Sequence, residues 1–262
     1  MSVIRKRQGG SHLISKFCAT NDCFEVPKFR PNWGATVLDL LKNPEYQYGV
    51  TLDMKSWFHH LQLSRKAQRW ARFKVGSQLF VMKGMPFGLK SSPYWAHRLS
   101  QPVKQWMRAQ GIACLWYVDD LLILARDRQT LEQQVLQVLA QLTKLGIQVN
   151  FSKSQLTPTT TLSYLGVMRN LVTKTFQAMP DKIKAARSTL KHLLKASTVP
   201  PKFFAKAAGQ LLDLAKAIQE LHGLPKILMR EAGKDVARQR RSRPTLKEKA
   251  LWALSAPKTP NL

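Results

Sequence analysis

The sequence predicts a mixed α/β body, built of both strands and helices, followed by a basic helical domain that starts near residue 180. Between residues 50 and 179, short runs of apolar, β-branched and aromatic residues alternate with segments of helical periodicity. After Pro180 the apolar residues recur at helical spacing and lysines occupy the polar faces. With 262 residues, 44% of them hydrophobic, the chain is long enough for a sizeable core in one large domain or two closely packed ones.

The elements predicted between residues 50 and 111 are a strand, a hairpin and a helix. "VTLDMKSWFHHLQL" (50–63) begins as a strand and breaks at Lys55. "RWARFKVGSQLFVMKGMPFG" has apolar alternation on both sides of Gly76-Ser77, which is typical of a hairpin. "SSPYWAHRLSQPVKQWMRAQG" predicts a helix, with Pro93 near its start and Gly111 after its end.

The next segment, "CLWYVDDLLILA", has the composition of strands, and a tight turn within it would place Asp119 and Asp120 at the tip of a hairpin. "TLEQQVLQVLAQLTKLG" then predicts a helix that begins with a capping box of Thr130 and Gln133 and ends at Gly146. Its expected inward face consists of Leu131, Val135, Leu142 and Leu145. "IQVNF" predicts a short strand, and "TLSYLGVMRNLVTKTFQAM" predicts a hairpin.

Two basic helices are predicted in the last third of the chain. "DKIKAARSTLKHLLKA" should be capped by Asp181 and should bury Ile183, Leu190 and Leu194. "PPKFFAKAAGQLLDLAKAIQELHG" enters a second helix through Pro200-Pro201 and should end at Gly223. Residues 231–262 are polar and basic, which is compatible with a solvated helix or a flexible tail.

The charge balance points to a polyanionic partner. Lys and Arg total 42 against 15 Asp and Glu, a formal net charge of +27, and the basic residues are spread along the chain. Nucleic acid is the commonest polyanion that such a surface binds. An anionic membrane surface is the alternative, but the chain has no apolar run of transmembrane length and its basic helices lack a strong aromatic face.

Three cysteines are too few and too scattered for a disulfide framework or a tetrahedral zinc site. The basic "MSVIRKRQGG" is not followed by an apolar core and is therefore no secretory signal. We expect reduced thiols and an intracellular protein, with nucleus and cytoplasm equally open.

The pair Asp119-Asp120 raises a problem of charge, because apolar runs flank it on both sides. Burying one carboxylate is costly without a partner, and a second one beside it raises the proton affinity of both. Divalent cations such as Mg²⁺ prefer carboxylate oxygens and would relieve the repulsion. Among the other acids, Asp53 stands out at the end of the apolar strand "GVTLDM", so Asp53 with Asp119 could form a two-metal site for phosphoryl transfer.

The order and spacing of "LDMKSWFHH", "MPFGLKSSP", "YVDD", "LGIQVNFSKS" and "LSYLGV" resemble the consecutive palm motifs of reverse transcriptases. "YVDD" alone is moderately specific, whereas "MPFGL" followed by "YVDD" and "YLG" is a strong combination. Within that group "MPFGL" and "YLG" resemble long-terminal-repeat retroelements. The stretch "AAGQLLDLAKAI" is most similar to the tyrosine-recombinase (DIRS-like) retrotransposons, with gypsy-like elements as the alternative.

The resemblance implies an α+β fold of the right-hand polymerase type, in which helices pack on the antiparallel sheet of the palm. It assigns residues 1–49 to a partial fingers segment, 50–179 to the palm with a fingers insertion at about 64–84, 180–230 to a helical thumb or connection, and 231–262 to a basic tail. It further implies an RNA-directed DNA polymerase that adds deoxynucleotides to a primer on an RNA or DNA template. Two Mg²⁺ ions, or Mn²⁺ in their place, would be held by the catalytic carboxylates Asp53, Asp119 and Asp120.

The resemblance also implies two sets of substrate contacts. Nucleotide contacts carried over from the family are Phe58 (beneath the incoming sugar), Arg69, Lys66, Phe87, Gly88 and Lys153. Primer or template contacts carried over are Tyr117, Val118, Lys90, Tyr164, Leu165 and Gly166. Each has an ordinary structural alternative: Phe58 as a core aromatic, the lysines and arginine as solvated charges, and the glycine segments as plain turns.

One departure from the family pattern sets the rival hypotheses. The usual first finger strands with an "R-P-x-x-D" signature are not recognisable upstream of "SHLISKFCATND", and nothing suggests a ribonuclease H domain. The first rival is therefore a non-catalytic nucleic-acid-binding relic that keeps the fold. The second is an RNA-templated RNA polymerase, against which Phe58 argues. The sequence leaves the oligomeric state open.

Overall fold

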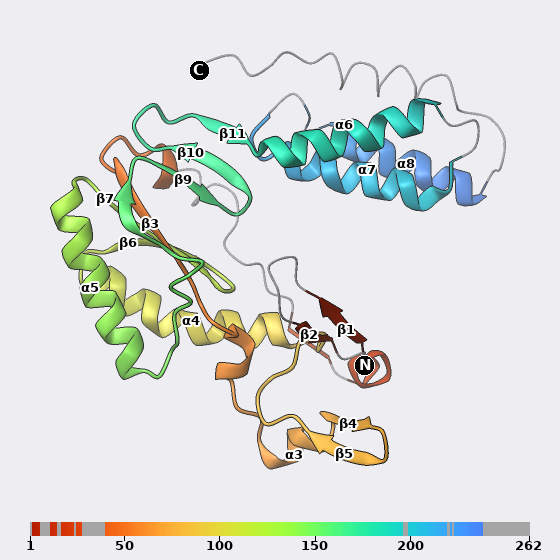
Figure 1. Cartoon of the computed structure of the whole chain (residues 1–262), viewed down its shortest axis with the longest axis horizontal. Coiled ribbons are helices and arrows are strands. Elements are labelled where there is room, and N and C mark those ends of the chain that lie inside the picture. The colour runs from red at the N-terminus through yellow and green to blue at the C-terminus, as the bar shows by residue number, and fades with distance from the viewer. Residues whose placement is uncertain are drawn as a thin grey trace. The chain divides into compact units, whose positions relative to one another are not determined.

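The computed structural model describes residues 2–5, 11–14, 17–23, 25–27, 40–195, 199–218, 221 and 223–237. The chain divides into two compact units, Met1–Thr160 (unit 1) and Thr161–Leu262 (unit 2). Figure 1 shows the four-stranded sheet of unit 1 in orange to green and the helices of unit 2 in cyan to blue.

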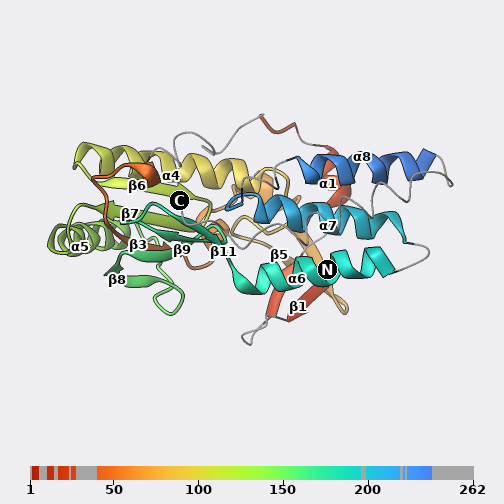
Figure 2. The same ribbon diagram turned by 90° about the horizontal axis from the view of Figure 1, so that it is seen from above.

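Unit 1 is built on a four-stranded antiparallel sheet in the order β6-β7-β3-β8. Its strands are β3 (Tyr48–Asp53), β6 (Ala113–Tyr117), β7 (Asp120–Ala125) and β8 (Gln155–Thr159). The predicted α+β class is confirmed, because two long helices, α4 (Ser92–Ala109) and α5 (Arg128–Lys144), pack against this sheet (Figures 1 and 2).

The core of unit 1 lies between one face of the sheet and the two helices. Residues directly opposite each other in an antiparallel pair point to the same face, so Val50 with Ile123 and Leu52 with Leu121 form one apolar surface. These four side chains are at most 1% exposed and cluster with buried residues of α4 and α5 such as Met107 and Leu131. The alternate residues of β3, including Asp53, therefore face away from the helices.

Smaller elements surround this sheet. The predicted break at Lys55 is confirmed, because a 3₁₀ helix, η1 (Trp57–His60), follows β3 after a short turn. The predicted hairpin is also confirmed as β4 (Arg72–Val75) and β5 (Gln78–Val81), and it is preceded by α3 (Arg65–Gln68). Near the N-terminus are the β1–β2 hairpin (Ser2–Arg5 and Ser11–Ile14) and α1 (Cys18–Asp22).

In its described residues, unit 2 combines a three-stranded antiparallel sheet with three helices. Its strands are β9 (Thr161–Tyr164), β10 (Val167–Asn170) and β11 (Phe176–Ala178), and its helices are α6 (Pro180–Lys195), α7 (Pro201–Leu214) and α8 (Leu224–Ala237). The helices bury a second apolar cluster, which includes Leu190, Leu211 and Leu228. None of the helices in the described ranges is long and apolar enough to cross a membrane.

Several boundaries differ from those expected. The predicted capping box of α5 is wrong: the helix begins one turn earlier, and Asp127 caps it by accepting a hydrogen bond from the Thr130 N–H at 2.8 Å. Asp181 lies within the first turn of α6 and does not cap it. Leu145, expected on the buried face of α5, is 51% exposed because the helix has ended.

The strand expected in "IQVNF" is reduced to one bridge between Val149 and Met54, whereas β8, which was not predicted, completes that edge of the sheet. The second basic helix ends at Leu214 and not at Gly223, and α8 continues to Ala237, across the expected start of the tail at residue 231. The rest of that tail lies outside the described residues.

The compact units also divide at Thr160–Thr161 and not near residue 180. The reason is that β9, β10 and β11 form a sheet of their own and do not join the four-stranded sheet of unit 1.

Candidate functional site

Asp53, Asp119 and Asp120 come together because of the pairing of two strands. Asp53 is the last residue of β3, and Asp120 is the first residue of β7 and its direct cross-strand partner. The Met54 N–H donates to the carbonyl oxygen of Asp119 at 2.8 Å, which extends the ladder by one step. The three aspartates thus lie at one end of the sheet, and the alternation of the strands turns Asp53 and Asp120 to the face away from α4 and α5.

The turn that carries Asp119 has a strained backbone. Val118 and Asp119 form a two-residue connection between β6 and β7, and Val118 has φ +51°, a left-handed conformation that is unusual for a β-branched residue. The indole N–H of Trp116 donates to the carbonyl oxygen of Val118 at 2.9 Å. The Trp116 ring also packs against buried Trp57 of η1, with 5.2 Å between ring centroids. The Val118–Asp119 turn is therefore anchored to the hydrophobic core of unit 1.

Asp53 is fixed from its other side by the loop "NFSKS" (150–154). The hydroxyl of Ser154 accepts a hydrogen bond from the Asp53 N–H at 2.9 Å, and the same hydroxyl donates to the carbonyl oxygen of Asn150 at 2.8 Å. The Asn150 N–H donates to the carbonyl oxygen of Asp53 at 2.7 Å. Both the N–H and the carbonyl oxygen of Asp53 are therefore hydrogen-bonded to this loop. These bonds fix the backbone from which the Asp53 side chain extends.

The electrostatics of the three carboxylates are unfavourable without a cation. Burial raises the pKa of Asp119, and the charge of Asp53 raises it further, against the lowering effects of its own backbone hydrogen bond and of Lys153. Burial, followed by the charges of Asp119 and Asp53, raises the pKa of Asp120 to about 6, again opposed by Lys153. The ammonium group of Lys153 is thus close enough to act on both carboxylates, although its side chain is exposed.

Whether the three aspartates can hold a metal ion depends on how closely their side chains gather. Within the described ranges, no group of three or more His, Cys, Asp and Glu side chains is gathered closely enough to hold one. The expected three-carboxylate ligand set is therefore not converged, although the backbone brings its members to one sheet end. Mg²⁺ commonly binds proteins through one or two carboxylates, with water and substrate phosphate as the other ligands. Two of the three aspartates with raised proton affinity fit that donor requirement.

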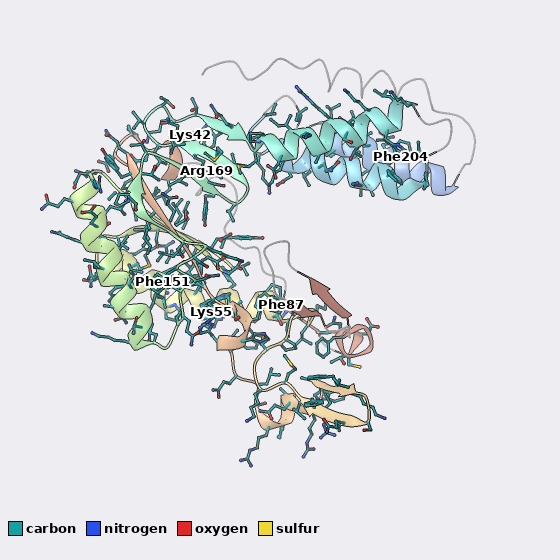
Figure 3. All side chains as sticks on the ribbon, in the orientation of Figure 1. Lys42, Lys55, Phe87, Phe151, Arg169 and Phe204 are labelled. Atoms are coloured by element: carbon teal, nitrogen blue, oxygen red, sulfur yellow. The ribbon has the colours of Figure 1, made fainter. Side chains whose placement is uncertain are left out.

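Phe58 and Phe87 contact each other beside this sheet end. Phe58, half-buried on η1, meets the Phe87 ring edge-on with 5.0 Å between centroids. The Met85 N–H donates to the carbonyl oxygen of Leu61 at 2.8 Å, which ties the segment "MPFGL" to the end of η1. Gly84 permits this approach, because a Cβ there would stand 2.9 Å from the carbonyl oxygen of His59. Figure 3 labels Phe87 and Lys55 among the side chains of unit 1.

The segment after Phe87 is held by α1. Gly88 has φ +91°, and its carbonyl oxygen accepts a hydrogen bond from the side-chain amide of Asn21 at 3.0 Å. The Lys90 N–H donates to the other end of the same amide, the Oδ1 of Asn21, at 2.8 Å. One asparagine therefore spans the loop on which Phe87, Gly88 and Lys90 lie.

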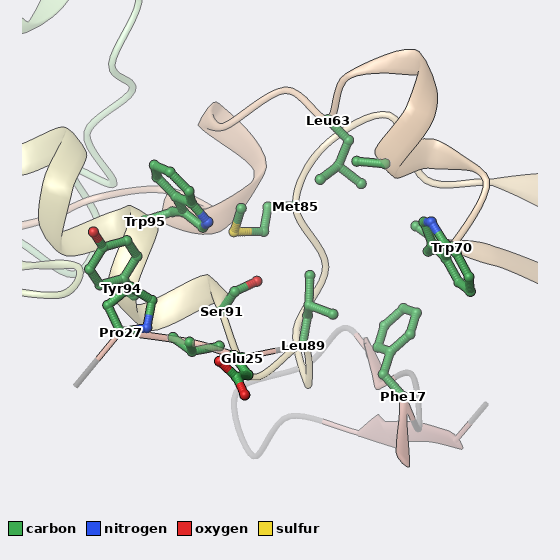
Figure 4. A pocket seen from close by; sticks show the side chains of 13 residues that line it. Phe17, Glu25, Pro27, Leu63, Trp70, Met85, Leu89, Ser91, Tyr94 and Trp95 are labelled. Carbon is green, nitrogen blue, oxygen red and sulfur yellow. The ribbon is translucent and has the colours of Figure 1, made fainter. Parts of the chain in front are cut away.

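A cavity of about 380 Å³ lies behind the same segment (Figure 4). Met85 and Leu89, on either side of the Phe87-Gly88 pair, contribute to its lining. The rest of the lining is mainly aromatic and apolar, and the three aspartates are not part of it. The cavity therefore belongs to the packing behind the "MPFGL" segment and is separate from the carboxylates.

The remaining predicted contacts are divided between unit 1 and unit 2. Lys66, Arg69 and Lys90 have exposed side chains, while Tyr117 and Val118 are half-buried at the strand end that carries the aspartates. Tyr164, Leu165 and Gly166 belong to unit 2: Tyr164 ends β9, and the other two form the turn to β10. Leu165 has φ +52° and Gly166 φ +79°, the pattern of a type I′ hairpin turn.

Several supporting residues were missed from the sequence. Asn150 and Ser154 lie in a motif that was noted only for Lys153, and Trp116 was read only as part of an apolar run. Asn21 lies in "SHLISKFCATND", a stretch in which no site residue was predicted. The sequence marks the loop that holds Asn150 and Ser154 by its small polar residues Asn150, Ser152 and Ser154. The partners of Asn21 are 67 and 69 residues away and leave no local pattern.

The chain is similar to a known protein family and to several known proteins. The family model described as reverse transcriptase (RNA-dependent DNA polymerase) matches residues 11–168. The retrovirus-related Pol polyprotein from transposon opus of Drosophila melanogaster is 27% identical over 183 residues, 66% of this chain and 18% of the relative. Protein P of duck hepatitis B virus (strain China) is 23% identical over 200 residues, 76% of this chain and 25% of the relative. The chain thus spans about a quarter or less of the length of these two relatives.

Solved structures share the fold at low sequence identity. The foamy viral protease-reverse transcriptase in complex with dsDNA superposes with a TM-score of 0.63 at 16% identity, covering 96% of this chain and 50% of that one. The same viral protein in complex with an RNA/DNA hybrid gives 0.62 at 17% identity, over 97% and 33% of the two chains. These likenesses show a shared fold. The family model, which matches more than half of the chain, shows that the chain belongs to the reverse transcriptase (RNA-dependent DNA polymerase) family.

Proposed function

We propose that this chain is the polymerase core of a reverse transcriptase, which adds deoxynucleotides to a primer on an RNA or DNA template. The observation that carries the proposal is the placement of Asp53, Asp119 and Asp120 at one sheet end by the β3–β7 ladder. The raised pKa values of Asp119 and Asp120, caused by burial first and then by neighbouring carboxylates, support a site suited to divalent cations.

The proposed division of labour follows the two units. Unit 1 would provide the palm, with α3 and the β4–β5 hairpin as the fingers insertion. In unit 2 the β9–β10 turn would grip the primer, and α6, α7 and α8 would form the thumb or connection. Basic residues on the exposed surfaces of α6 and α7, such as Lys184, Lys191 and Lys206, would contact phosphates and contribute affinity without sequence preference.

We further propose Mg²⁺ as the cofactor, with two ions per site and Mn²⁺ as a possible substitute. Bound at the carboxylates, the ions would lower the pKa of the primer hydroxyl and neutralise the leaving pyrophosphate. Asp53 and Asp119 would be the principal ligands, with Asp120 as the third carboxylate. The residues of the chain would orient these groups: Ser154 and Asn150 hold Asp53, and Trp116 holds the turn of Asp119.

The substrate contacts are also proposals. Lys66 and Arg69 are exposed on and just after α3, as contacts to a triphosphate require. Phe58 and Phe87 would line the nucleotide, and Gly88 would let the backbone approach it. Lys153 would act near the pyrophosphate, which agrees with its electrostatic effect on Asp119 and Asp120. Tyr117, Val118 and Lys90 would meet the primer or template.

The subgroup within the family is a finer proposal. We propose a long-terminal-repeat-like retroelement, and within that class a tyrosine-recombinase (DIRS-like) element, on the strength of "AAGQLLDLAKAI". The relative from transposon opus supports the retroelement class. A phylogeny of the palm motifs tests the finer assignment, which is wrong if the chain groups with gypsy-like elements.

The deciding experiment is primer extension with Mg²⁺ on matched RNA and DNA templates. The wild-type chain should extend both, and Asp53→Asn or Asp119→Asn should abolish extension while primer–template binding stays nearly unchanged, because the lost interaction acts on the transition state. Glu132→Gln, an exposed acid on α5, is the matched control. Intact binding without any extension by the wild type would support the non-catalytic relic.

A further inference from the structure

Gly166 lies against the ammonium group of a lysine from a neighbouring helix. With φ +79° it is the second residue of the type I′ turn between β9 and β10. The Nζ of Lys182, on the first turn of α6, occupies the space that a Cβ on residue 166 would need. The absence of a side chain at 166 therefore serves two purposes: it permits the turn, and it makes room for Lys182.

Lys182 is held in that place by Asp213 of α7. Its Nζ donates to the Oδ2 of Asp213 at 2.5 Å, and Lys216 donates to the Oδ1 of the same carboxylate at 2.6 Å. The side chains of Lys182 and Asp213 are 32% and 31% exposed, so the pair is mostly shielded from water. A Cβ on Gly166 would also stand 4.0 Å from the Asp213 carboxylate, which places turn, lysine and aspartate in one cluster.

Lys182 and Asp213 each occupy a helix position that is unfavourable for the charge of the side chain. Lys182 lies in the first turn of α6, where the helix dipole favours acids, and Asp213 lies in the last turn of α7, where it favours bases. Pairing offsets both penalties and brings the start of α6 to the end of α7, while Gly166 leaves the space that the paired lysine occupies. An ordinary surface ion pair would not depend on a glycine in a third element.

We infer that Lys182, anchored by Asp213, is a positioning residue for the Leu165–Gly166 turn, which it ties to helices α6 and α7. The inference rests on the proposed function for what the turn does, namely seating the primer end. The tie itself rests only on the contacts within unit 2.

A double-mutant cycle tests the tie without any assay of activity. Gly166→Ala should strain the backbone and also displace Lys182 from Asp213, whereas in a Lys182→Ala background only the backbone strain remains. The cost of Gly166→Ala in melting temperature should therefore be smaller in the Lys182→Ala background, by about 2–4 °C for a chain of this size. Lys184→Ala, an exposed lysine two positions along α6, is the matched control and should be additive with Gly166→Ala. Additivity of Gly166→Ala with Lys182→Ala would overturn the inference.

Single-turnover primer extension tests the positioning role. Lys182→Ala and Asp213→Asn should each lower the extension rate at saturating primer–template by about 10-fold or more, since small misplacements of reacting groups are costly. The dissociation constant for primer–template should change by less than about threefold, which is a small change in binding free energy at roughly 1.4 kcal/mol per factor of ten. Measured well below the melting temperature, a variant that only loses stability would keep the wild-type rate.

The two tests separate the possible failures. An unchanged rate in both variants would show that the pair is merely structural and would overturn the positioning role. A wild-type chain that extends no primer would instead refute the proposed function, and the stability cycle would then decide alone whether Lys182 holds the turn.

Discussion

Asp53 and Asp120 are direct cross-strand partners at the end of the β3–β7 ladder. Two like charges in this relation destabilise a strand pair, and Asp119, joined to Met54 through its carbonyl oxygen, adds a third. The fold tolerates the arrangement because Ser154, Asn150 and Trp116 hold the backbone around it. Repulsion between the carboxylates lowers the stability of the fold at this end of the sheet, and a bound cation would restore it.

Magnesium should therefore stabilise the folded chain. At a concentration 100 times its dissociation constant, a ligand of the native state alone adds about 2.7 kcal/mol, so the melting temperature should rise with Mg²⁺. Asp53→Asn should raise the melting temperature in the presence of a chelator, because it removes a repelling charge, and should reduce the Mg²⁺-dependent rise. The measurement is thermal unfolding over a Mg²⁺ titration.

Glu132→Gln provides the control for this titration, since it removes an acid from an exposed position on α5. It should leave the Mg²⁺ response of the wild type intact. An equal Mg²⁺ response in Asp53→Asn and wild type would show that the ion binds elsewhere.

Ser154→Ala should weaken the site although Ser154 is not a proposed ligand. Without the hydroxyl, the half-buried N–H of Asp53 loses its acceptor, which typically costs about 1–3 kcal/mol. We expect a lower free energy of unfolding, and a slower extension rate because Asp53 is no longer fixed. Ser152→Ala is the matched control, because the Ser152 hydroxyl donates to the side chain of Asn150 and not to the strand. Equal effects of the two substitutions would argue against the role given to Ser154.

The Lys182–Asp213 cluster predicts a dependence of stability on pH. Burial opposes ionisation of Asp213, but the hydrogen bonds from Lys182 and Lys216 outweigh it and lower the pKa below the usual 3.8. A carboxyl with a lowered folded-state pKa stabilises the fold above the unfolded-state value and loses that contribution as pH falls through the folded-state value. Stability should thus decline below about pH 4, and less so in Asp213→Asn. Chemical unfolding of both proteins between pH 7 and 3 measures it, and parallel curves would contradict the prediction.

The predictable part of the fold is the part written in local periodicity. Strand β3, the β4–β5 hairpin and helix α4 follow from apolar spacing and from glycine or proline at their ends. Strand β8 did not follow, because "QLTPT" has little apolar alternation and its pairing with β3 depends on tertiary contacts. The cap of α5 was misplaced since Thr130 and Asp127 both suit that position, and only the structure shows which carboxylate or hydroxyl accepts the bond.

The candidate site divides in the same way. Asp53, Asp119 and Asp120 could be proposed from the sequence because acids are rare here and apolar residues precede or flank them. The residues that hold them act through the backbone of distant segments: Ser154 bonds to a strand 101 residues earlier, and Asn21 spans a loop 67 residues later. Such contacts leave no periodic pattern and no bias of composition in the sequence. The charged groups of a site are therefore easier to predict from a sequence than the residues that hold them in place.

Phe58→Ala should change the choice of sugar. The ring lies on η1, five residues after Asp53, with one edge against Phe87 and part of its surface against the core of unit 1. If it also packs beneath the incoming sugar, a 2′-hydroxyl must clash with it, and fitting an extra group into a packed site costs about 1–3 kcal/mol. That corresponds to roughly 5- to 150-fold discrimination against ribonucleotides. The variant should incorporate ribonucleotides more readily relative to deoxynucleotides, and should lose some deoxynucleotide efficiency because a packing surface is gone.

Single-nucleotide extension with each sugar on one primer–template measures the ratio of efficiencies. Phe204→Ala, which removes the same ring from α7 in unit 2, is the matched control and should leave the ratio unchanged. Phe87→Ala tests the contact between the rings: if Phe87 holds Phe58 in place, its loss should shift the ratio in the same direction by a smaller factor. An unchanged ratio in Phe58→Ala would mean that the ring serves only the core, and the preference for DNA over RNA synthesis would then rest on family membership alone.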